Sequence, residues 1–365
     1  MRVLIDATSV LLRSAGIKSY TYHWISQLRQ IADRDTRIQA FPFLQDLGEL
    51  NHEQSVISPA ATYARLALLY FVNIPGNPAI DWISSSVDVF HVSNQIRNTP
   101  TRSRLTATIF DLTCWIVPGF HTAANLTAEK SFAERILKKA HRLIAISENS
   151  RADAIRILNL DPDRIEVIHP GVPEAYFGAS PTPRAKPYVL YVGAIEPRKN
   201  VDGLLDAWHL LSASLRQEFD LVIAGASGWQ SERTAQRLEA GVSDVHYLRY
   251  VPERDLPGLT AGATAFIYPS LYEGFGFPVA QAMACGVPVI TSRNSCLPEI
   301  AGPGALFIDP RSPSDISAAI EQLLTLPSLR ERLGQAGSLH AQQYRWNVSA
   351  RKSLDFFRRV YGKAG

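Results

Sequence analysis

YPSLYEGFGFPVAQAMACG, residues 268–286, places a glutamate and two glycines between two segments of different composition. The apolar run 265–268 before the loop is typical of a strand, and the residues after it have helical composition with a proline in the first turn. Gly274 and Gly276 would let the main chain approach a phosphate or sugar, and a helix N-terminus offers N–H groups to it. The stretch therefore predicts a ligand site with Glu273 at its mouth, the alternative being a plain buried turn with a solvated Glu273.

The overall composition indicates a globular protein with more than one domain. The 365 residues exceed what one hydrophobic core usually organises, and 46% are hydrophobic and 19% charged. A net charge of +3 is too small to indicate a nucleic-acid partner without a basic patch or a known reader motif. The three cysteines lack CxxC spacing and an even count, so neither a disulfide framework nor a zinc site is indicated, and a reducing cytoplasm fits best.

Membrane insertion is not expected. The segment Met1–Asp6 begins at once with strand-like residues and lacks the apolar region of a signal peptide. The longest apolar stretch, residues 64–72 with Arg65 inside, is far shorter than the roughly 18 residues of a spanning helix. A modest basic cluster leaves two interpretations open, a solvated helix face or peripheral contact with anionic lipid at the inner membrane face. It consists of Arg97, Arg102, Arg104, Arg135, Lys138, Lys139 and Arg142.

Strand-like and helix-like segments alternate along both halves of the chain, which predicts two α/β domains with parallel, doubly wound sheets. The expected strands are 3–5, 38–41, 88–91, 107–109, 143–146, 165–168, 188–192, 221–224, 246–248, 265–268, 287–290 and 306–308. The expected helices include 19–32, 148–158, 201–215 and the amphipathic segment 346–361. Prolines and glycines crowd into 170–187, so we expect a linker there between domains 1–169 and 188–345, followed by a closing helix in 346–365.

A second motif, YVGAIEPRKN at residues 191–200, again follows a strand and precedes a helix. Arg198 offers a bidentate fork and Lys199 a point charge, and together they can neutralise a diphosphate leaving group. Such a pair is common on protein surfaces, but the position next to Gly193 favours a functional role.

The two motifs together resemble those of retaining glycosyltransferases of the GT4 type, which have the GT-B fold. The family's element GxxxxRKN matches residues 193–200, and its Glu, seven residues, Glu signature matches 273–281 except that Gln281 replaces the second glutamate. With the element 221–225 and the sequence LPEI at 297–300, the resemblance covers nearly the whole second domain. The segment 191–200 is closest to that of mannosyltransferases that build bacterial surface polysaccharides. The resemblance also implies that the last helix crosses back to the first domain.

The resemblance implies a role for each matched residue of the second domain. Arg198 and Lys199 would stabilise the diphosphate, and Glu273 would contact hydroxyls of the donor sugar. Gly193 and Gly274 would keep the loops close to the donor, Phe275 and Gly276 would offer backbone N–H groups, and Gln281 would meet the ribose. The neutral amide of Gln281 makes weaker contacts than a carboxylate, so donor affinity is what this departure puts in question.

In the first domain the resemblance is looser. Gly16 matches the glycine-rich turn whose backbone meets the donor diphosphate in relatives, and no GxGxxG follows the first strand, which argues against a nicotinamide enzyme. Relatives often have His-Asp where this chain has Phe110 and Asp111. Asp111 is therefore the predicted acceptor-side polar group, able to orient a hydroxyl, with a loop-capping role as the alternative. His91 is a further candidate substrate-binding residue, its alternative being a structural one.

The expected enzyme is a glycosyltransferase of polysaccharide biosynthesis that moves a hexose from a nucleotide diphosphate sugar to a hydroxyl of a glycan or lipid-linked acceptor. Mannose from GDP-mannose is the first choice and a UDP-sugar the second. No metal is expected, because the DxD sequences at 33–35 and 161–163 do not follow an apolar strand. Two alternatives remain: a non-catalytic nucleotide-sugar-binding protein, suggested by Phe110 and Gln281, and a GT-B epimerase using Asp111 and His91.

Overall fold

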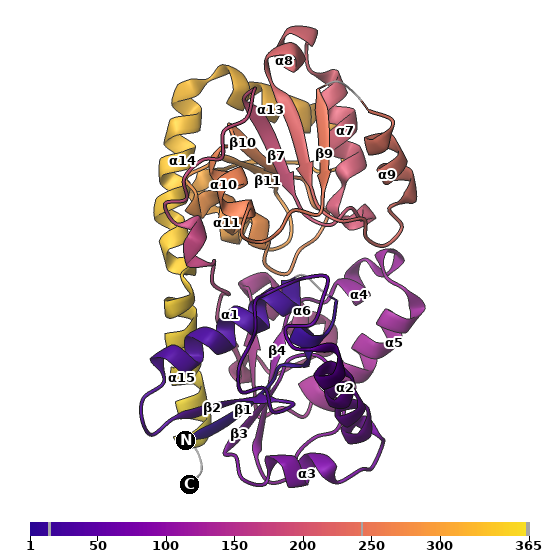
Figure 1. Ribbon diagram of the computed structural model, residues 1–365, viewed down its shortest axis with the longest axis vertical. Coiled ribbons are helices and arrows are strands. Elements are labelled where there is room, and N and C mark those ends of the chain that lie inside the picture. Colours follow the sequence, from indigo (N-terminus) through magenta and orange to yellow (C-terminus); the bar gives the residue numbers. More distant parts are fainter. Residues whose placement is uncertain (14–15, 242–243, 363–365) are drawn as a thin grey trace. The chain divides into compact units, whose positions relative to one another are not determined.

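The computed structural model describes residues 1–13, 16–241 and 244–362. The chain divides into two compact units, unit 1 with Met1–Gly171 and Arg345–Gly365, and unit 2 with Val172–Tyr344. Each unit holds a six-stranded parallel sheet (Figure 1), which confirms the predicted pair of doubly wound α/β domains. The boundary between the units falls at Gly171, so most of the expected linker 170–187 is part of unit 2.

The sheet of unit 1 has the strand order β2-β1-β3-β4-β5-β6, with every neighbouring pair parallel. Its strands are β1 (Arg2–Asp6), β2 (Arg37–Phe41), β3 (Val89–Val92), β4 (Arg104–Ile109), β5 (Arg142–Ala145) and β6 (Ile165–Val167). Its helices are α1 (Gly16–Ile31), α2 (Pro59–Asn73), α3 (Ala79–Ser84), α4 (Thr113–Ile116), α5 (Ala123–Phe132), α6 (Glu148–Leu158) and α15 (Trp346–Gly362). Each strand and helix expected in this half lies within three residues of the observed bounds. Helices α2 to α5 were not expected.

Helix α15 packs against α1 inside unit 1 (Figure 1), which confirms that the closing helix returns to the first domain. The indole Nε1 of Trp24 in α1 donates to Oγ of Ser353 in α15 at 2.9 Å, and both side chains are fully buried. The ring of Phe357 also lies against Trp24, with 6.0 Å between ring centroids. The last segment of the chain is therefore part of the core of unit 1.

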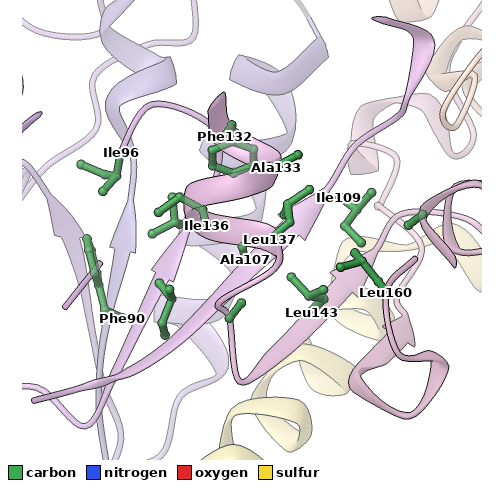
Figure 2. Close-up of a cluster of buried hydrophobic side chains, with 14 of the residues drawn as sticks. Phe90, Ile96, Ala107, Ile109, Phe132, Ala133, Ile136, Leu137, Leu143 and Leu160 are labelled. Atoms are coloured by element: carbon green, nitrogen blue, oxygen red, sulfur yellow. The ribbon is translucent and has the colours of Figure 1, made fainter. Parts of the chain in front are cut away.

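The sheet of unit 1 is buried on both faces, as the continuous apolar runs of its strands require. One cluster of buried side chains joins β3, β4 and β5 to α5 and the turn after it (Figure 2). In this cluster Phe90, Ala107 and Leu143 come from the strands, and Phe132 comes from the end of α5. The carboxyl ends of these strands are thus held in fixed positions.

The sheet of unit 2 has the order β12-β11-β10-β7-β8-β9, again with all neighbours parallel. Its strands are β7 (Tyr188–Val192), β8 (Asp220–Ala224), β9 (Val245–Arg249), β10 (Ala265–Tyr268), β11 (Val289–Ser292) and β12 (Ala305–Ile308). Its helices are α7 (Val201–Leu210), α8 (Ala213–Glu218), α9 (Glu232–Glu239), α10 (Leu256–Ala261), α11 (Phe277–Ala284), α12 (Leu297–Ala301), α13 (Pro313–Thr325) and α14 (Pro327–Ala341). The order brings β10 next to β7 although β8 and β9 lie between them in the chain.

One sequence expectation needs correction, and one segment forms a helix for which no expectation was made. The single helix expected over 201–215 is interrupted at Leu211, because the hydroxyl of Ser212 accepts from the N–H of Leu215 and starts α8 as a new helix. The apolar stretch 64–72 belongs to α2, a 15-residue helix of which only Thr62 and Val72 are fully buried. By contrast, the predicted cap of α6 is confirmed, since Oγ of Ser147 accepts from the N–H of Ser150.

Candidate functional site

The two sequence motifs of unit 2 follow adjacent strands of its sheet. The segment 193–200 continues from β7 and ends in a single 3-10 turn, Pro197–Lys199, whereas 269–276 continues from β10. Since β7 and β10 are parallel neighbours, both loops leave the same edge of the sheet, where ligands bind in open α/β sheets. The backbone N–H of Leu271 donates to the carbonyl of Arg198 at 2.8 Å and joins the loops directly.

The glutamate of the first motif and the two cations of the second form one ion-pair cluster. Nζ of Lys199 lies 2.6 Å from Oε1 of Glu273, and a guanidinium nitrogen of Arg198 lies 3.1 Å from Oε2. The hydroxyl of Ser270 also donates to Oε1 at 2.5 Å, and the hydroxyl of Tyr268 lies 3.1 Å from the same oxygen. The structure thus brings together Arg198, Lys199 and Glu273, three of the four residues predicted as catalytic.

Glu273 is buried and ionised in this cluster. Its residue is 7% exposed, so the alternative of a solvated Glu273 does not hold. Burial by itself would raise the pKa of the carboxyl, but the charges of Arg198 and Lys199 and the bonds from Lys199 and Ser270 outweigh it and lower the pKa to about 2. For Lys199, burial and the charge of Arg198 lower the pKa of the ammonium, while Glu273 acts in the opposite direction.

Arg198 is also tied to its own loop and to the next. It donates to the carbonyl of Tyr272 at 2.6 Å and to the carboxylate of Glu196 at 3.0 Å. Two carboxylates therefore balance the two cations before any anionic ligand is bound. In the described part of the chain the ammonium of Lys199 makes two hydrogen bonds, to Glu273 and to the hydroxyl of Tyr268, which leaves its third N–H for a ligand.

Glycines shape the backbone around this cluster. Gly225, directly after β8, has a φ of +159°, and a Cβ there would lie 1.8 Å from the carbonyl oxygen of Gly193. Only glycine allows these two loops to approach so closely. Gly276 has a φ of +83° and caps α11, and within the described residues the N–H groups of Gly276 and Phe277 have no hydrogen-bond partner. The helix N-terminus therefore offers the two N–H groups that anion binding requires.

The neighbouring candidates differ in how accessible they are. Gly274 lies in the same loop as Glu273, between β10 and α11. The side chain of Phe275 is 2% exposed and packs edge-on against Phe277 and Tyr344, so it has no side-chain face for a ligand. Gln281 is half-buried in the second turn of α11, and among the described residues its side chain makes no hydrogen bond.

In unit 1 the structure corrects the prediction for His91. The side chain is fully buried, and its two ring nitrogens lie 2.9 Å and 2.8 Å from the hydroxyls of Thr106 and Thr108 on β4. Burial lowers the pKa of the imidazole to about 3, so the ring is neutral. His91 joins β3 to β4 inside the core and has no face for a substrate.

Asp111 and Gly16 lie at the carboxyl edge of the same sheet. Asp111 follows β4 and accepts from the N–H and hydroxyl of Thr113 through Oδ1, which starts α4, while Oδ2 has no partner among the described residues. Asp111 therefore caps its loop through Oδ1, as the alternative expectation held, and Oδ2 remains for a ligand. Gly16 is the exposed first residue of α1, and a Cβ there would meet no atom within 4 Å.

Comparison with known proteins identifies the family. Residues 173–340 match the model described as "Glycosyl transferases group 1", and residues 46–176 match "Glycosyltransferase Family 4". O-antigen chain mannosyltransferase B of Escherichia coli is 34% identical over 267 residues, which cover 70% of each chain. This chain belongs to the group 1 glycosyltransferases. The predicted family membership and enzyme class are thereby confirmed.

A further relative of this glycosyltransferase is also a mannosyltransferase by name, while others are D-inositol 3-phosphate glycosyltransferases. "Serotype-specific mannosyltransferase WbdA" of Escherichia coli is 27% identical over 61% of this chain, which spans 29% of that longer protein. Among solved structures, sucrose-phosphate synthase of Thermosynechococcus elongatus superposes with a TM-score of 0.75 at 19% identity, each chain fully covered. The lipopolysaccharide glycosyltransferase WaaG superposes with a TM-score of 0.71 at 16% identity, and both chains are again fully covered. These structures confirm the GT-B fold.

Two residues near the candidate sites of the glycosyltransferase were missed by sequence reasoning. Lys18 in α1 is fully buried, and its ammonium donates to the carbonyls of Leu12 and Gln54 at 2.8 and 2.6 Å, while burial lowers its pKa to about 8. It holds the segment after β1 in place. Asp6 is fully buried at the end of β1, and its position directly after an apolar strand is the signal that could have indicated it.

The described residues contain no group of three or more His, Cys, Asp or Glu side chains placed to hold a metal ion. None of the helices described in this glycosyltransferase is long and apolar enough to cross a membrane. None of the three cysteines forms a disulfide.

Proposed function

We propose that this glycosyltransferase transfers a mannosyl residue from GDP-mannose to a hydroxyl of a glycan or lipid-linked acceptor, with retention at the anomeric carbon. The observation that carries the proposal is the cluster of Arg198, Lys199 and Glu273 beside the N-terminus of α11. The two E. coli relatives are mannosyltransferases, which favours mannose over other hexoses. A UDP-sugar is the second choice, since UDP is the ligand in the structure of Anabaena HepE, which has the same fold.

The donor diphosphate would bind at the edge formed by the two loops of unit 2. The free N–H of Lys199 and the N–H groups of Gly276 and Phe277 are donors suited to its oxygens. As the bond between the sugar and the diphosphate breaks, negative charge grows on the leaving oxygen. Donors already held in place stabilise that charge without further reorganisation, which lowers the barrier.

The ion pair with Glu273 would position Lys199 for this task. A lysine side chain has considerable rotamer freedom, and fixing its ammonium before the donor arrives removes that cost from the reaction. Glu273 would in turn accept hydrogen bonds from hydroxyls of the donor sugar with its remaining lone pairs. Gln281 would hydrogen-bond to the ribose hydroxyls. Retention would follow from attack on the same face as the leaving group, with a donor phosphate oxygen taking the acceptor proton.

The direct test is incubation with GDP-mannose and UDP-glucose, each radiolabelled in the sugar, with and without methyl mannosides as acceptors. We expect labelled product from GDP-mannose and slow hydrolysis without acceptor. Binding of donor without any turnover would favour a nucleotide-sugar-binding protein, and an isomerised donor sugar would favour an epimerase. Transfer from UDP-glucose alone would leave the enzyme class intact and overturn the donor.

We also infer that helix α2 brings the enzyme to a lipid surface. After Pro59, the exposed positions of α2 recur at helical spacing and are all apolar or aromatic: Ala60, Tyr63, Ala64, Ala67, Tyr70 and Phe71, followed by the exposed Ile74 just after the helix. A surface helix normally presents polar residues there. The adjoining helix α3 adds Trp82, which is 79% exposed, so one apolar strip extends over both helices.

Charge favours a lipid bilayer as the occupant of the strip. No Asp or Glu occurs between Gln54 and Ile80, and the segment contains Arg65. Tyrosine and tryptophan are the side chains preferred at the boundary between headgroups and acyl chains. This surface differs from the basic cluster considered from the sequence, in which Arg97 is held by its own loop and Lys138 pairs with Glu134 at 2.6 Å.

Sedimentation with anionic vesicles tests the lipid surface. The paired change Tyr70→Ser and Trp82→Ser should reduce vesicle binding severalfold without affecting melting, because both side chains are more than three-quarters exposed. Leu339→Ser, at an equally exposed apolar residue of α14, is the matched control and should bind as the wild type does. If the double variant and the control bind vesicles equally, α2 does not contact the lipid surface.

A further inference from the structure

Charged side chains that the proposed donor site does not use gather at the carboxyl edge of the sheet of unit 1. Asp6 ends β1, Arg97 lies in the loop after β3, and Asp111 follows β4. These three strands are parallel neighbours, so their ends lie at one edge of the sheet. His91 does not belong to this group, because its ring bonds to Thr106 and Thr108 and packs against Trp24 and Phe357 in the core.

Arg97 is held in place from three sides. Its backbone N–H donates to Oδ1 of Asn73 at 2.8 Å, and its guanidinium donates to the carbonyl of Asn94 at 2.6 Å. The guanidinium carbon also lies 5.3 Å from the centre of the Phe132 ring, a cation–π distance. Phe132 and Ile96, the residue before Arg97, belong to the same core cluster (Figure 2).

Glu129 faces this arginine from α5. It precedes Phe132 by three residues, so both side chains lie on the same side of the helix, and Phe132 is buried in the core. The Glu129 side chain is half-buried, yet in the described part of the chain its carboxyl has neither a hydrogen bond nor an ion pair within 4 Å. Its oxygens still reach solvent, so the carboxyl is open to a ligand.

The surroundings make Glu129 titrate near neutrality. Burial is the main cause that raises the pKa of its carboxyl to about 7, the Asp111 carboxylate adds to the rise, and Arg97 opposes it. Burial also raises the pKa of the Cys114 thiol on α4 to about 12, and the carboxylates of Glu129 and Asp111 add to the rise. Burial lowers the pKa of the Arg97 guanidinium. Glu129 and Asp6 oppose that change, and Arg135 adds to it.

We propose that Glu129, Asp111 and Arg97 bind the acceptor, with Glu129 and Oδ2 of Asp111 accepting from vicinal hydroxyls of a neutral sugar and Arg97 donating to a sugar oxygen. The inference rests on the proposed glycosyl transfer and names the substrate class for unit 1. Three carboxylates, counting Asp6, lie in range of two guanidiniums, those of Arg97 and Arg135, and this excess of negative charge disfavours a phosphorylated acceptor. Hydroxyl groups suit the site because they can donate to carboxylates and accept from arginine.

The experiment compares Glu129→Gln with the wild type in mannosyl transfer to methyl mannosides between pH 6 and 8. Ionised Glu129 accepts stronger hydrogen bonds, so kcat/KM for the acceptor should rise with pH in the wild type. Glu129→Gln should raise the acceptor KM about tenfold or more and remove that rise, while the Kd for GDP-mannose stays unchanged. Asp111→Asn should shift the rise to lower pH, because it removes a charge that raises the pKa of Glu129.

The matched control is Glu134→Gln, at an exposed carboxylate in the π-helical turn Ala133–Leu137 directly after α5, which pairs with Lys138. It should leave KM and the pH profile unchanged. A wild-type acceptor KM and pH profile in Glu129→Gln would overturn the acceptor site while leaving the transfer reaction standing. Absence of transfer by the wild type to any mannoside, with GDP-mannose bound, would instead overturn the proposed function.

Discussion

The ammonium of Lys199 and the carboxylate of Glu273 lie 2.6 Å apart, although the residues are 74 positions apart in the sequence. The pair joins the loops that follow β7 and β10, and both side chains are largely buried. Because the residue predicted to bind the sugar also holds the residue predicted to stabilise the diphosphate, the two roles cannot be altered independently. Experiments on either residue must therefore measure stability as well as turnover.

Lys199→Ala and Arg198→Ala should each lower turnover on the order of a hundredfold, since each removes charge stabilisation that grows in the transition state. Each also leaves Glu273 with one cation fewer, and breaking a buried ion pair costs about 3–5 kcal/mol of unfolding free energy. Kinetics and urea unfolding should be measured together. The charge-preserving changes Lys199→Arg and Arg198→Lys are the matched controls and should lose less stability. A folded alanine variant with near-normal turnover would contradict the leaving-group role.

Glu273→Gln should lower the unfolding free energy at neutral pH, and the loss should shrink as the solution becomes acidic. The folded-state pKa of about 2 lies below the usual value of about 4.5, so ionised Glu273 stabilises the protein above pH 4.5. That contribution disappears as pH falls from about 4.5 towards 2. Urea unfolding of both proteins at pH 7, 5, 4 and 3 measures it. A constant difference down to pH 3 would mean that the carboxyl is not held ionised.

The replacement Gln281→Glu should tighten donor binding severalfold and change turnover much less. A charge-assisted bond exceeds a neutral one by about 1 kcal/mol, and ribose contacts are made equally in the ground and transition states. Calorimetry with GDP-mannose gives the Kd, and kcat is measured alongside. Should the glutamate variant bind no more tightly, Gln281 does not hold the ribose.

Transfer activity should survive EDTA. The expectation rests on Arg198 and Lys199, two cations that can take the place of a metal at the diphosphate. The assay compares initial rates in EDTA and in Mg²⁺ or Mn²⁺ after removal of bound metal. Loss of activity on chelation that either ion restores would count against this account.

Helix α15 should be essential to the stability of unit 1. Phe357 is fully buried against Trp24, so Phe357→Ala should lower the unfolding free energy by about 3–5 kcal/mol. Tyr361→Ala, at a half-exposed residue of the same helix, is the control and should stay within about 0.5 kcal/mol of the wild type. Similar stabilities of the two variants would show that α15 does not complete the core.

The sequence was sufficient for the strands and for the two loops of unit 2, because apolar runs followed by glycine and proline are local signals. The pairing of Lys199 with Glu273 could not be predicted, since it depends on β10 lying beside β7. The role of His91 depended in the same way on the threonines of the neighbouring strand β4. Helix α2 was missed because apolar residues fill its exposed positions as well as its partly buried ones, which removes the usual periodic signal.

The measurement that tests the central claim most directly is transfer of radiolabelled mannose from GDP-mannose to a methyl mannoside, with the anomeric configuration of the product determined by NMR. The account predicts an α-linked product, as in the α-linked donor, whose formation falls about a hundredfold in Lys199→Ala. A β-linked product, or no product from a folded enzyme that binds GDP-mannose, would contradict it.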